Sequence, residues 1–235
     1  MTEFTSTQAD APQPPAAPKA YPRFEIKPEF PAAVRERLQS VDATVQANAD
    51  KANAELKPRL NKIGFGLEQL GKLARAGSKH RVRGMSLLRE LATVWAHSVA
   101  KAASCKIGCT ACCHTPVPIS AVEAKVIGKA IKRHPVAVTQ SAVTADGGPV
   151  PNMGACPFLV ENKCAIYKER PMICRTRFNL DVDALLCDEA LNDAQIPVPY
   201  ASATPFHHAY RQLSADAEYG DIREFFPSGL SAKAV

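Results

Sequence analysis

Apolar residues recur at steps of three and four positions in successive stretches between residues 31 and 99. This spacing places side chains on one face of an α-helix and predicts an amphipathic helix for each stretch. The first stripe comprises Val34, Leu38, Val41 and Val45. The second comprises Leu60, Ile63, Leu67, Leu70 and Leu73, and the third comprises Met85, Leu88, Leu91, Trp95 and Val99. Pro58 and Gly77 mark the boundaries, since proline disfavours helix in the residue before it and glycine readily ends a helix.

A fourth helix is predicted to begin after Ser120. Ser120 and Glu123 have the spacing of a capping box, in which each side chain accepts a hydrogen bond from the other residue's exposed backbone N–H. The apolar residues of its inner face are Val122, Val126, Ile127 and Ile131. Residues 134–151 are expected to form a loop, and residues 207–226 are compatible with helix. No internal repeat and no strong strand alternation appears, so the sequence predicts a mostly α fold.

Composition and the N-terminal sequence indicate the compartment. The chain has 235 residues and a mass of 25.3 kDa, enough to bury a hydrophobic core without cross-links. Its N-terminal stretch lacks the basic start and apolar run of a secretory signal, and no apolar stretch of about 18 residues indicates a membrane span. These features predict a cytoplasmic, reduced protein with no membrane partner. In that compartment a dense set of thiols holds metal more often than it forms disulfides.

All eight cysteines lie between Cys105 and Cys187. Cys109 and Cys112 have the C-x2-C spacing that lets a tight turn present two thiolates to one metal, about 2.3 Å away. Cys105 adds a C-x3-C step, whereas Cys113 cannot easily share one tetrahedron with Cys112, because neighbouring side chains tend to diverge. The downstream group comprises Cys156, Cys164, Cys174 and Cys187. The candidate metal ligands therefore suit two four-cysteine sites, or one such site with spare thiols.

Two cofactors fit these spacings. Short gaps between cysteines are typical of zinc sites that stabilise a fold, and all-cysteine ligation with C-x2-C runs is equally typical of a 4Fe-4S iron–sulfur cluster. Thiolates suit both, and copper or another soft metal as well. The absence of another convincing ligand favours the iron–sulfur cluster slightly. His114, inside the cluster, is either a ligand or proton donor, or a residue that caps a loop.

The cysteine motifs resemble a known family. The segments "CKIGCTACCHTPVPISAVEA" and "CPFLVENKCAIYKERPMICRTRFN", followed by Cys187, are similar to the YkgJ-like cysteine-cluster proteins, a zinc- or iron-chelating domain with a C-x2-C-x2-C-C signature. The resemblance covers roughly residues 105–188, and the first gap in this chain is three residues instead of two. The ligands that the resemblance implies most directly are Cys109, Cys112, Cys113, Cys156, Cys164 and Cys174.

The same resemblance implies an alternative function. A flagellin lysine N-methylase that resembles this family carries an iron–sulfur cluster. It implies an iron–sulfur-dependent enzyme of redox or lysine methyl-transfer chemistry as the alternative to a protein that only binds metal.

Taken together, these features predict the domain organisation. Residues 1–22 read as a disordered Ala/Pro-rich tail, because they are too poor in large apolar residues to offset the entropy of ordering. Residues 23–103 are expected to form an amphipathic helical segment, and residues 104–190 a cysteine-cluster metal-binding domain with many loops. Residues 191–235 are expected to form a C-terminal helical extension.

Arg170, Arg175 and Arg177 are candidate cofactor-binding residues. Four thiolates around a dication leave a net negative charge, so a guanidinium near the sulfurs would orient the ligands and offset this charge. The alternative is ordinary ion pairing at the surface.

The net charge of +6 and pI of about 8.9 raise a third hypothesis. Arg75, Lys79, Arg81 and Arg83 cluster between two predicted helices. Such a patch would let a structural zinc module dock on a nucleic acid or protein partner, and binding would then weaken with salt. A solvated basic face is the simpler interpretation. Without interleaved aromatic residues, a nucleic acid partner is the less favoured of the two.

Overall fold

The computed structural model describes residues 25–106, 108–139, 141, 154–188, 190–191 and 196–229. The predicted tail, residues 1–22, and much of the predicted loop at 134–151 lie outside the described residues. The α-helices are α1 (Ala32–Leu56), α2 (Leu60–Arg75), α3 (Ser78–Val99), α4 (Ala121–Ile131), α5 (Met172–Thr176), α6 (Thr204–Leu213) and α7 (Ile222–Phe225). Short 3-10 helices are η1 (Lys57–Arg59), η2 (Ala111–Cys113), η3 (Tyr167–Glu169) and η4 (Leu185–Cys187). The strands are β1 (Pro118–Ser120), β2 (Leu159–Val160), β3 (Lys163–Cys164) and β4 (Tyr219–Asp221). The predicted mostly α fold, with a cysteine-rich region of loops, is confirmed.

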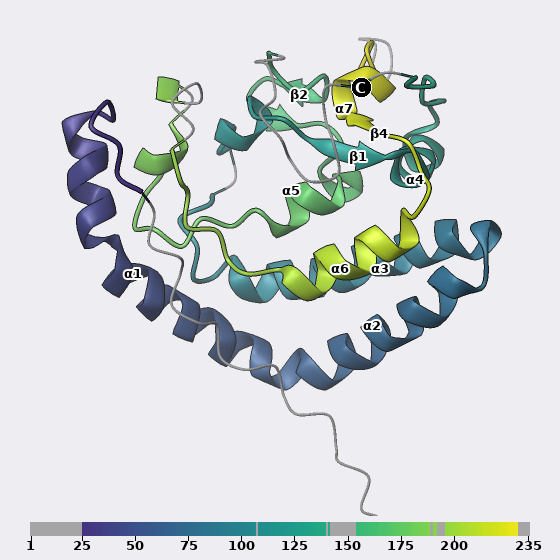
Figure 1. The fold of residues 1–235 in the computed structure, drawn as a ribbon, viewed down its shortest axis with the longest axis horizontal. Helices are drawn as coiled ribbons and strands as arrows, with labels where there is room; N and C mark the ends of the chain where they lie inside the picture. The colour runs from purple at the N-terminus through teal and green to yellow at the C-terminus, as the bar shows by residue number, and fades with distance from the viewer. Residues whose placement is uncertain are drawn as a thin grey trace, which may run out of the picture.

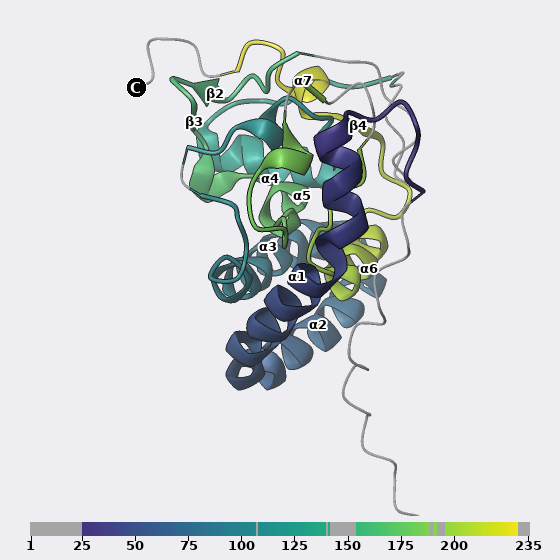
Figure 2. The same ribbon diagram turned by 90° about the vertical axis from the view of Figure 1, so that its left-hand side faces the viewer.

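The helices are arranged in layers. In Figure 1, α1 and α2 form one bowed band along the bottom, α3 and α6 lie above this band, and the short elements of the cysteine-rich region lie above these. The view turned by 90° in Figure 2 places β2 and β3 beyond α4 and α5, on the side away from α1 and α2. Within the described residues, no helix combines the length and the apolar character that a membrane crossing requires.

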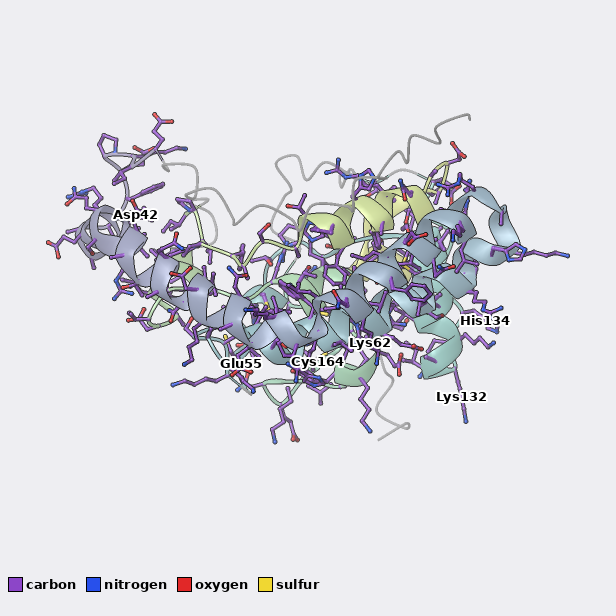
Figure 3. All side chains as sticks on the ribbon, turned by 90° about the horizontal axis from the view of Figure 1, so that it is seen from below. Asp42, Glu55, Lys62, Lys132, His134 and Cys164 are labelled. Carbon is purple, nitrogen blue, oxygen red and sulfur yellow. The ribbon has the colours of Figure 1, made fainter. Side chains whose placement is uncertain are left out.

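The predicted helical stripes face the core, with one exception. Val34, Leu38, Val41 and Val45 of α1 are buried, as are Met85, Leu88, Leu91, Trp95 and Val99 of α3. On α2 only Ile63 and Leu70 of the predicted stripe are buried, and Leu60 is exposed. The reason is that α2 packs on one side only, against α3 and α6, while Phe65 on its outer face is exposed. Figure 3 shows charged side chains, Glu55 and Lys62 among them, along the outside of this band.

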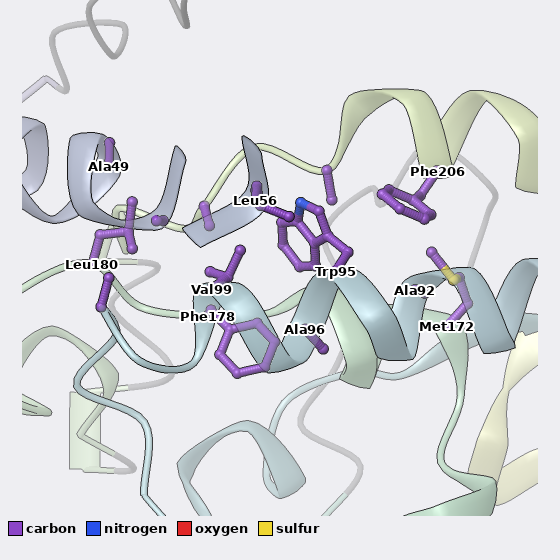
Figure 4. Close-up of a cluster of buried hydrophobic side chains, with 14 of the residues drawn as sticks. Ala49, Leu56, Ala92, Trp95, Ala96, Val99, Met172, Phe178, Leu180 and Phe206 are labelled. Carbon is purple, nitrogen blue, oxygen red and sulfur yellow. The ribbon is translucent and has the colours of Figure 1, made fainter. Parts of the chain in front are cut away.

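The larger hydrophobic core draws on all three predicted structural segments. Trp95 lies at its centre, with its ring 5.9 Å from the ring of Phe178 and 5.8 Å from that of Phe206 (Figure 4). Leu56 of α1 and Met172 of α5 belong to the same cluster. The helical segment, the cysteine-rich region and the C-terminal segment therefore share one core, and the burial of so much apolar surface is the main force that holds them together.

A smaller core supports the cysteine-rich region. It contains Ile119, Ile127, Phe158 and Phe225, and the thiols of Cys156, Cys164 and Cys174 pack against it. Two short antiparallel strand pairs border this core. In one, Pro118 of β1 is opposite Asp221 of β4, which brings the C-terminal segment beside the cysteines. In the other, Leu159 is opposite Cys164, and positive φ angles at Glu161 and Asn162 make the tight hairpin turn.

The predicted capping box at the start of α4 is only half right. Ser120 Oγ accepts a hydrogen bond from the Glu123 N–H at 3.2 Å, as expected. The Glu123 carboxylate, however, accepts from the Met172 N–H at 2.6 Å and from the Tyr210 hydroxyl at 2.9 Å. The Ser120 N–H donates to Tyr210 instead, at 2.7 Å. Glu123 is completely buried, so its carboxylate serves as a tertiary contact between α4, α5 and α6 rather than as a local cap.

Candidate metal centre

The eight cysteines come from seven short stretches of the chain. Cys105 follows α3, Cys109 precedes η2, and Cys112 and Cys113 end η2. Further along, Cys156 precedes β2, Cys164 ends β3, Cys174 lies in α5 and Cys187 ends η4. Every thiol is free, Cys109 is exposed and the other seven are partly buried. Among the described residues, no group of three or more His, Cys, Asp or Glu side chains has the geometry of a metal site.

One neighbourhood contains Cys105, Cys109, Cys112 and Cys187, which we call the first thiol set. Burial and, after it, the nearby thiols of Cys105, Cys109 and Cys112 together raise the pKa of Cys187 to about 12. Burial also raises the pKa of Cys105, with Cys109 and Cys112 acting in the same direction. These mutual effects arise because ionising one thiol is opposed by negative charge on its neighbours. The thiols of this set therefore influence one another's ionisation.

The other neighbourhood contains Cys113, Cys156, Cys164 and Cys174, which we call the second thiol set. Burial raises the pKa of Cys174 well above its usual range, and Cys112, Cys156 and Cys164 raise it further. The Cys156 N–H donates to the Cys113 carbonyl at 2.7 Å, which ties the loop before β2 to η2. Cys112, a member of the first set, also interacts with Cys174 of the second. Its sulfur accepts a hydrogen bond from Cys113, which lowers the pKa of Cys112.

Asn179 connects two thiols of the first set and was missed by the sequence analysis. Its backbone N–H donates to Cys105 Sγ at 3.4 Å, and its side-chain amide donates to Cys187 Sγ at 3.3 Å. The amide oxygen accepts from the Asp181 N–H at 2.9 Å, which fixes the orientation of the side chain. Asn179 is 1% exposed. Such N–H···S bonds stabilise thiolates and orient them toward a metal. The only sequence signal is that Asn179 ends the "CRTRFN" motif.

The second set is supported by backbone donors and by Arg223. The backbone N–H groups of Phe158 and Ile166 donate to the sulfurs of Cys156 and Cys164, and each lowers the pKa of its thiol against the larger raising effect of burial. Arg223 of α7 donates to the Cys113 carbonyl at 3.0 Å and to the Gly154 carbonyl at 2.6 Å. It also forms an ion pair with the buried Asp221 at 2.8 Å. Nothing in the sequence links Arg223 to cysteines so distant along the chain.

The candidate arginines differ in what they contact. Arg175 is buried, and it donates hydrogen bonds to oxygen atoms, namely the carbonyls of Lys168 and Arg170 and the Thr93 hydroxyl. Arg177 donates to Thr115 Oγ1 at 2.6 Å and lowers the pKa of Cys112 and Cys174 through its charge. Arg170 stacks on the ring of Tyr167 at 4.2 Å. Its charge lowers the pKa of Cys105, Cys112 and Cys164. A cofactor-binding role for the three stays a prediction.

Two further candidates from the sequence also have defined places. His114 directly follows η2 and its backbone N–H donates to the Ala111 carbonyl at 3.2 Å, so a ligand role stays a prediction. In the basic patch, Arg81 donates to the Ala215 carbonyl and lies 3.6 Å from the Asp216 carboxylate. Arg81 is therefore engaged with the segment after α6, whereas Arg83 is exposed.

A tyrosine approaches the first set through long-range backbone pairing. The Leu180 N–H donates to the Pro199 carbonyl at 3.0 Å, and the Ala201 N–H donates to the Phe178 carbonyl at 2.9 Å. This short antiparallel pairing includes a bridge between Asn179 and Tyr200. A cavity of about 180 Å³ lies beside it, lined among others by Cys112, Cys187 and Tyr200.

Comparison with known proteins identifies the cysteine-rich region. Residues 104–194 match the family model described as "CxxCxxCC: Putative zinc- or iron-chelating domain". The match confirms, over that segment, the family predicted from the cysteine spacings, and it supports the binding of zinc or iron. No curated protein and no solved structure matches the chain.

Proposed function

We propose that the protein binds metal through two four-cysteine centres, one in each thiol set, and that an iron–sulfur cluster is the favoured occupant, with zinc as the alternative. The mutual influence of neighbouring thiols supports this proposal, and Cys112, which acts on Cys105 and Cys187 as well as on Cys174, connects the two sets. Sulfur is the donor that zinc, iron–sulfur clusters and other soft metals accept. The all-cysteine donor set favours the cluster.

The surroundings of the thiols support a charged metal centre. Several thiolates around one metal leave negative charge, and burying this charge costs free energy unless donors or cations offset it. Asn179 supplies N–H donors to the first set, and the charge of Arg177 acts on Cys112 and Cys174. The eight cysteines between Cys105 and Cys187 would be the metal ligands. Arg170, Arg175 and Arg177 would act through their charge rather than as ligands.

Metal analysis of protein purified without oxygen tests this proposal. An absorption band near 400 nm, with about four iron and four sulfide per site, is the expected result for iron–sulfur clusters. A colourless protein with about two zinc ions would support the zinc alternative. In either case, Cys187→Ala and Cys164→Ala should each remove about half of the metal, because they lie in different thiol sets. Folded, reduced protein without stoichiometric metal would sink the proposal.

A further inference from the structure

A further cavity, of about 110 Å³, lies where four elements of the fold meet. Its lining residues come from β1, α5, α6 and β4, and in Figure 1 α5, β1 and β4 lie above α6. None of the eight cysteines, all of which the structure describes, belongs to this lining. A ligand of this cavity would therefore occupy a site separate from both thiol sets.

Two side chains of α6 make this cavity cationic. His207 and Arg211 both line it, both are exposed, and they lie one helical turn apart on the same face of the helix. Within the part of the chain that the structure describes, the Arg211 guanidinium has no hydrogen-bond or ion-pair partner. Loss of hydration around its ring lowers the pKa of His207, and the charges of Arg211 and Arg177 lower it further. An anion at the cavity would offset the repulsion among these cations.

The acidic and polar groups that contact the lining are already engaged inside the fold. The carboxylate of the buried Glu123 accepts a hydrogen bond from the hydroxyl of Tyr210, another lining residue, at 2.9 Å. The Thr176 hydroxyl donates to backbone carbonyls of α5 at 3.2 Å, so it accepts a hydrogen bond from His207 Nε2, also at 3.2 Å. This bond holds the His207 ring against α5. The cavity therefore offers the guanidinium of Arg211 to a ligand.

The rest of the lining is largely apolar. Pro118, Met172 and Ile173 contribute aliphatic surface. Tyr210 and Tyr219 contribute aromatic surface, with their rings 6.4 Å apart in an edge-on arrangement. The volume of about 110 Å³ is below the roughly 150 Å³ of a cavity that holds benzene, so a hydrocarbon chain of about three carbons fits. Apolar surface beside a cationic group suits a small anion with a hydrocarbon part.

We propose that this cavity binds a short-chain aliphatic carboxylate, whose oxygens pair with Arg211 beside His207 and whose hydrocarbon chain lies against the apolar part of the lining. The planar guanidinium matches a carboxylate through two parallel N–H···O bonds. The apolar lining distinguishes such a ligand from inorganic phosphate, which could pair with Arg211 but would leave that surface without a partner. The inference is independent of the proposed metal-binding function, because no thiol takes part in it.

Binding of propionate to the full chain tests the proposal. Saturation-transfer nuclear magnetic resonance of the propionate signals, measured at increasing concentration, gives the Kd. We expect a value on the order of 1 mM, which is within reach of a ligand of about five heavy atoms. Propionamide should bind about tenfold more weakly, because it lacks the charge that strengthens hydrogen bonds to Arg211. Inorganic phosphate should also bind about tenfold more weakly, because it buries no hydrocarbon. Displacement of propionate measures both competitors.

Variants locate the two parts of the ligand. Arg211→Gln should weaken propionate binding about tenfold, and Arg211→Lys should weaken it less, because an ammonium keeps the charge but not the planar fork. Arg83→Gln is the matched control, since Arg83 is exposed on α3 and outside the lining, and it should leave the Kd unchanged. Tyr219→Ala should reduce the preference for propionate over acetate, because it removes part of the apolar lining. This ratio of affinities is measured within one variant and does not depend on how stable that variant is.

His207 provides a spectroscopic readout at the cavity itself. A carboxylate next to the ring favours its protonated form, so propionate should raise the pKa of His207. Proton resonances of the imidazole rings, followed across pH with and without propionate, measure this change, and His207→Gln identifies the signal. His208 is the internal control, because it bonds to Gln212 at 3.0 Å and lies outside the lining. The pKa of His208 should not respond to propionate.

Several results would overturn the inference. One is the absence of saturable propionate binding, and another is binding of phosphate or propionamide as tightly as propionate. Propionate affinity that is unchanged in folded Arg211→Gln would also do so, as would a pKa change at His208 as large as that at His207. The metal content of the samples does not enter these comparisons, so the metal-binding proposal and this inference can fail separately.

Discussion

The side-chain amide of Asn179 donates a hydrogen bond to the sulfur of Cys187 at 3.3 Å. The same residue donates its backbone N–H to Cys105, so one asparagine holds two thiols that are far apart in the sequence. The Ser104 N–H and hydroxyl both donate to the Asn179 carbonyl. Hydrogen bonds to Cys105, Cys187 and Ser104 thus fix the position of Asn179 beside the first thiol set.

Replacing Asn179 by Asp should weaken metal binding at the first set. Aspartate keeps an oxygen for the Asp181 N–H but presents a carboxylate to Cys187 in place of an N–H donor. We expect metal affinity to fall by about tenfold to a hundredfold, the range typical of residues that orient metal ligands. Competition with a chelator at fixed pH measures this change. Asn48→Ala is the control, because the Asn48 side chain donates to the Leu180 carbonyl, at 2.7 Å, rather than to a sulfur. Equal metal affinity in Asn179→Asp and the original chain would contradict the role assigned to Asn179.

Arg223→Ala should destabilise the fold more than the loss of a surface charge does. The change removes the bonds to the carbonyls of Cys113 and Gly154 and leaves the completely buried Asp221 without its cation. We expect a loss of about 3 kcal/mol in the free energy of unfolding, because an unpaired buried charge is costly. Urea denaturation measures this loss.

The control for Arg223 is Arg83→Ala, since Arg83 is exposed and lies far from this ion pair in the sequence. It should leave the free energy of unfolding almost unchanged. The double variant Asp221→Asn with Arg223→Ala should cost less than the sum of the two single changes, because the residues form one ion pair. Additive losses would show that the pair is not coupled.

The sequence predicts the long helices well but the site only in part. The stripes of α1 and α3 repeat over many turns, so their periodicity specifies both the element and its buried face. The strands β1 to β4 are too short for alternation to appear, and only Asn162, at a turn with positive φ, hints at the hairpin of β2 and β3.

The candidate ligands themselves could be predicted because cysteine spacing is local information. Their grouping could not, because Cys105 and Cys187 are joined through Asn179, which donates hydrogen bonds to both sulfurs. The same holds for Arg223, which reaches Cys113 because β4 pairs with β1. Contacts of this kind depend on tertiary packing, and no local pattern in one sequence encodes them.

Two glycines in helices should respond to alanine in opposite ways. A Cβ on Gly128 of α4 would collide with the Arg133 carbonyl and approach Pro135 Cδ to 3.0 Å, because the chain folds back over the helix there. Gly128→Ala should therefore cost about 1–3 kcal/mol through overpacking. A Cβ on Gly64 of α2 would meet nothing within 4 Å, so Gly64→Ala should add about 0.5–1 kcal/mol through helix propensity. Thermal unfolding of both variants measures the two effects. A stabilised Gly128→Ala variant would mean that the segment after α4 does not pack on Gly128.

Glu123 should make stability depend on pH. Burial raises its pKa above the usual value of a glutamate, although the Met172 N–H, Arg89 and the Tyr210 hydroxyl act in the opposite direction. Between the unfolded and folded pKa values, the folded protein holds a proton that the unfolded chain has lost. Folding is then linked to proton uptake, so this contribution to stability is present below the unfolded pKa and is lost as pH rises through the folded pKa.

Glu123→Gln removes this titration and isolates its effect. The free energy of unfolding of the original chain, minus that of Glu123→Gln, should fall as pH rises and level off above the folded pKa. Urea denaturation of both proteins at steps from about pH 5 to about pH 8 measures this difference. Glu218→Gln is the control, since Glu218 is exposed. A difference that rises with pH instead would mean that the charged carboxylate is the stabilised form, and that the N–H and hydroxyl donors together with Arg89 outweigh the cost of burial.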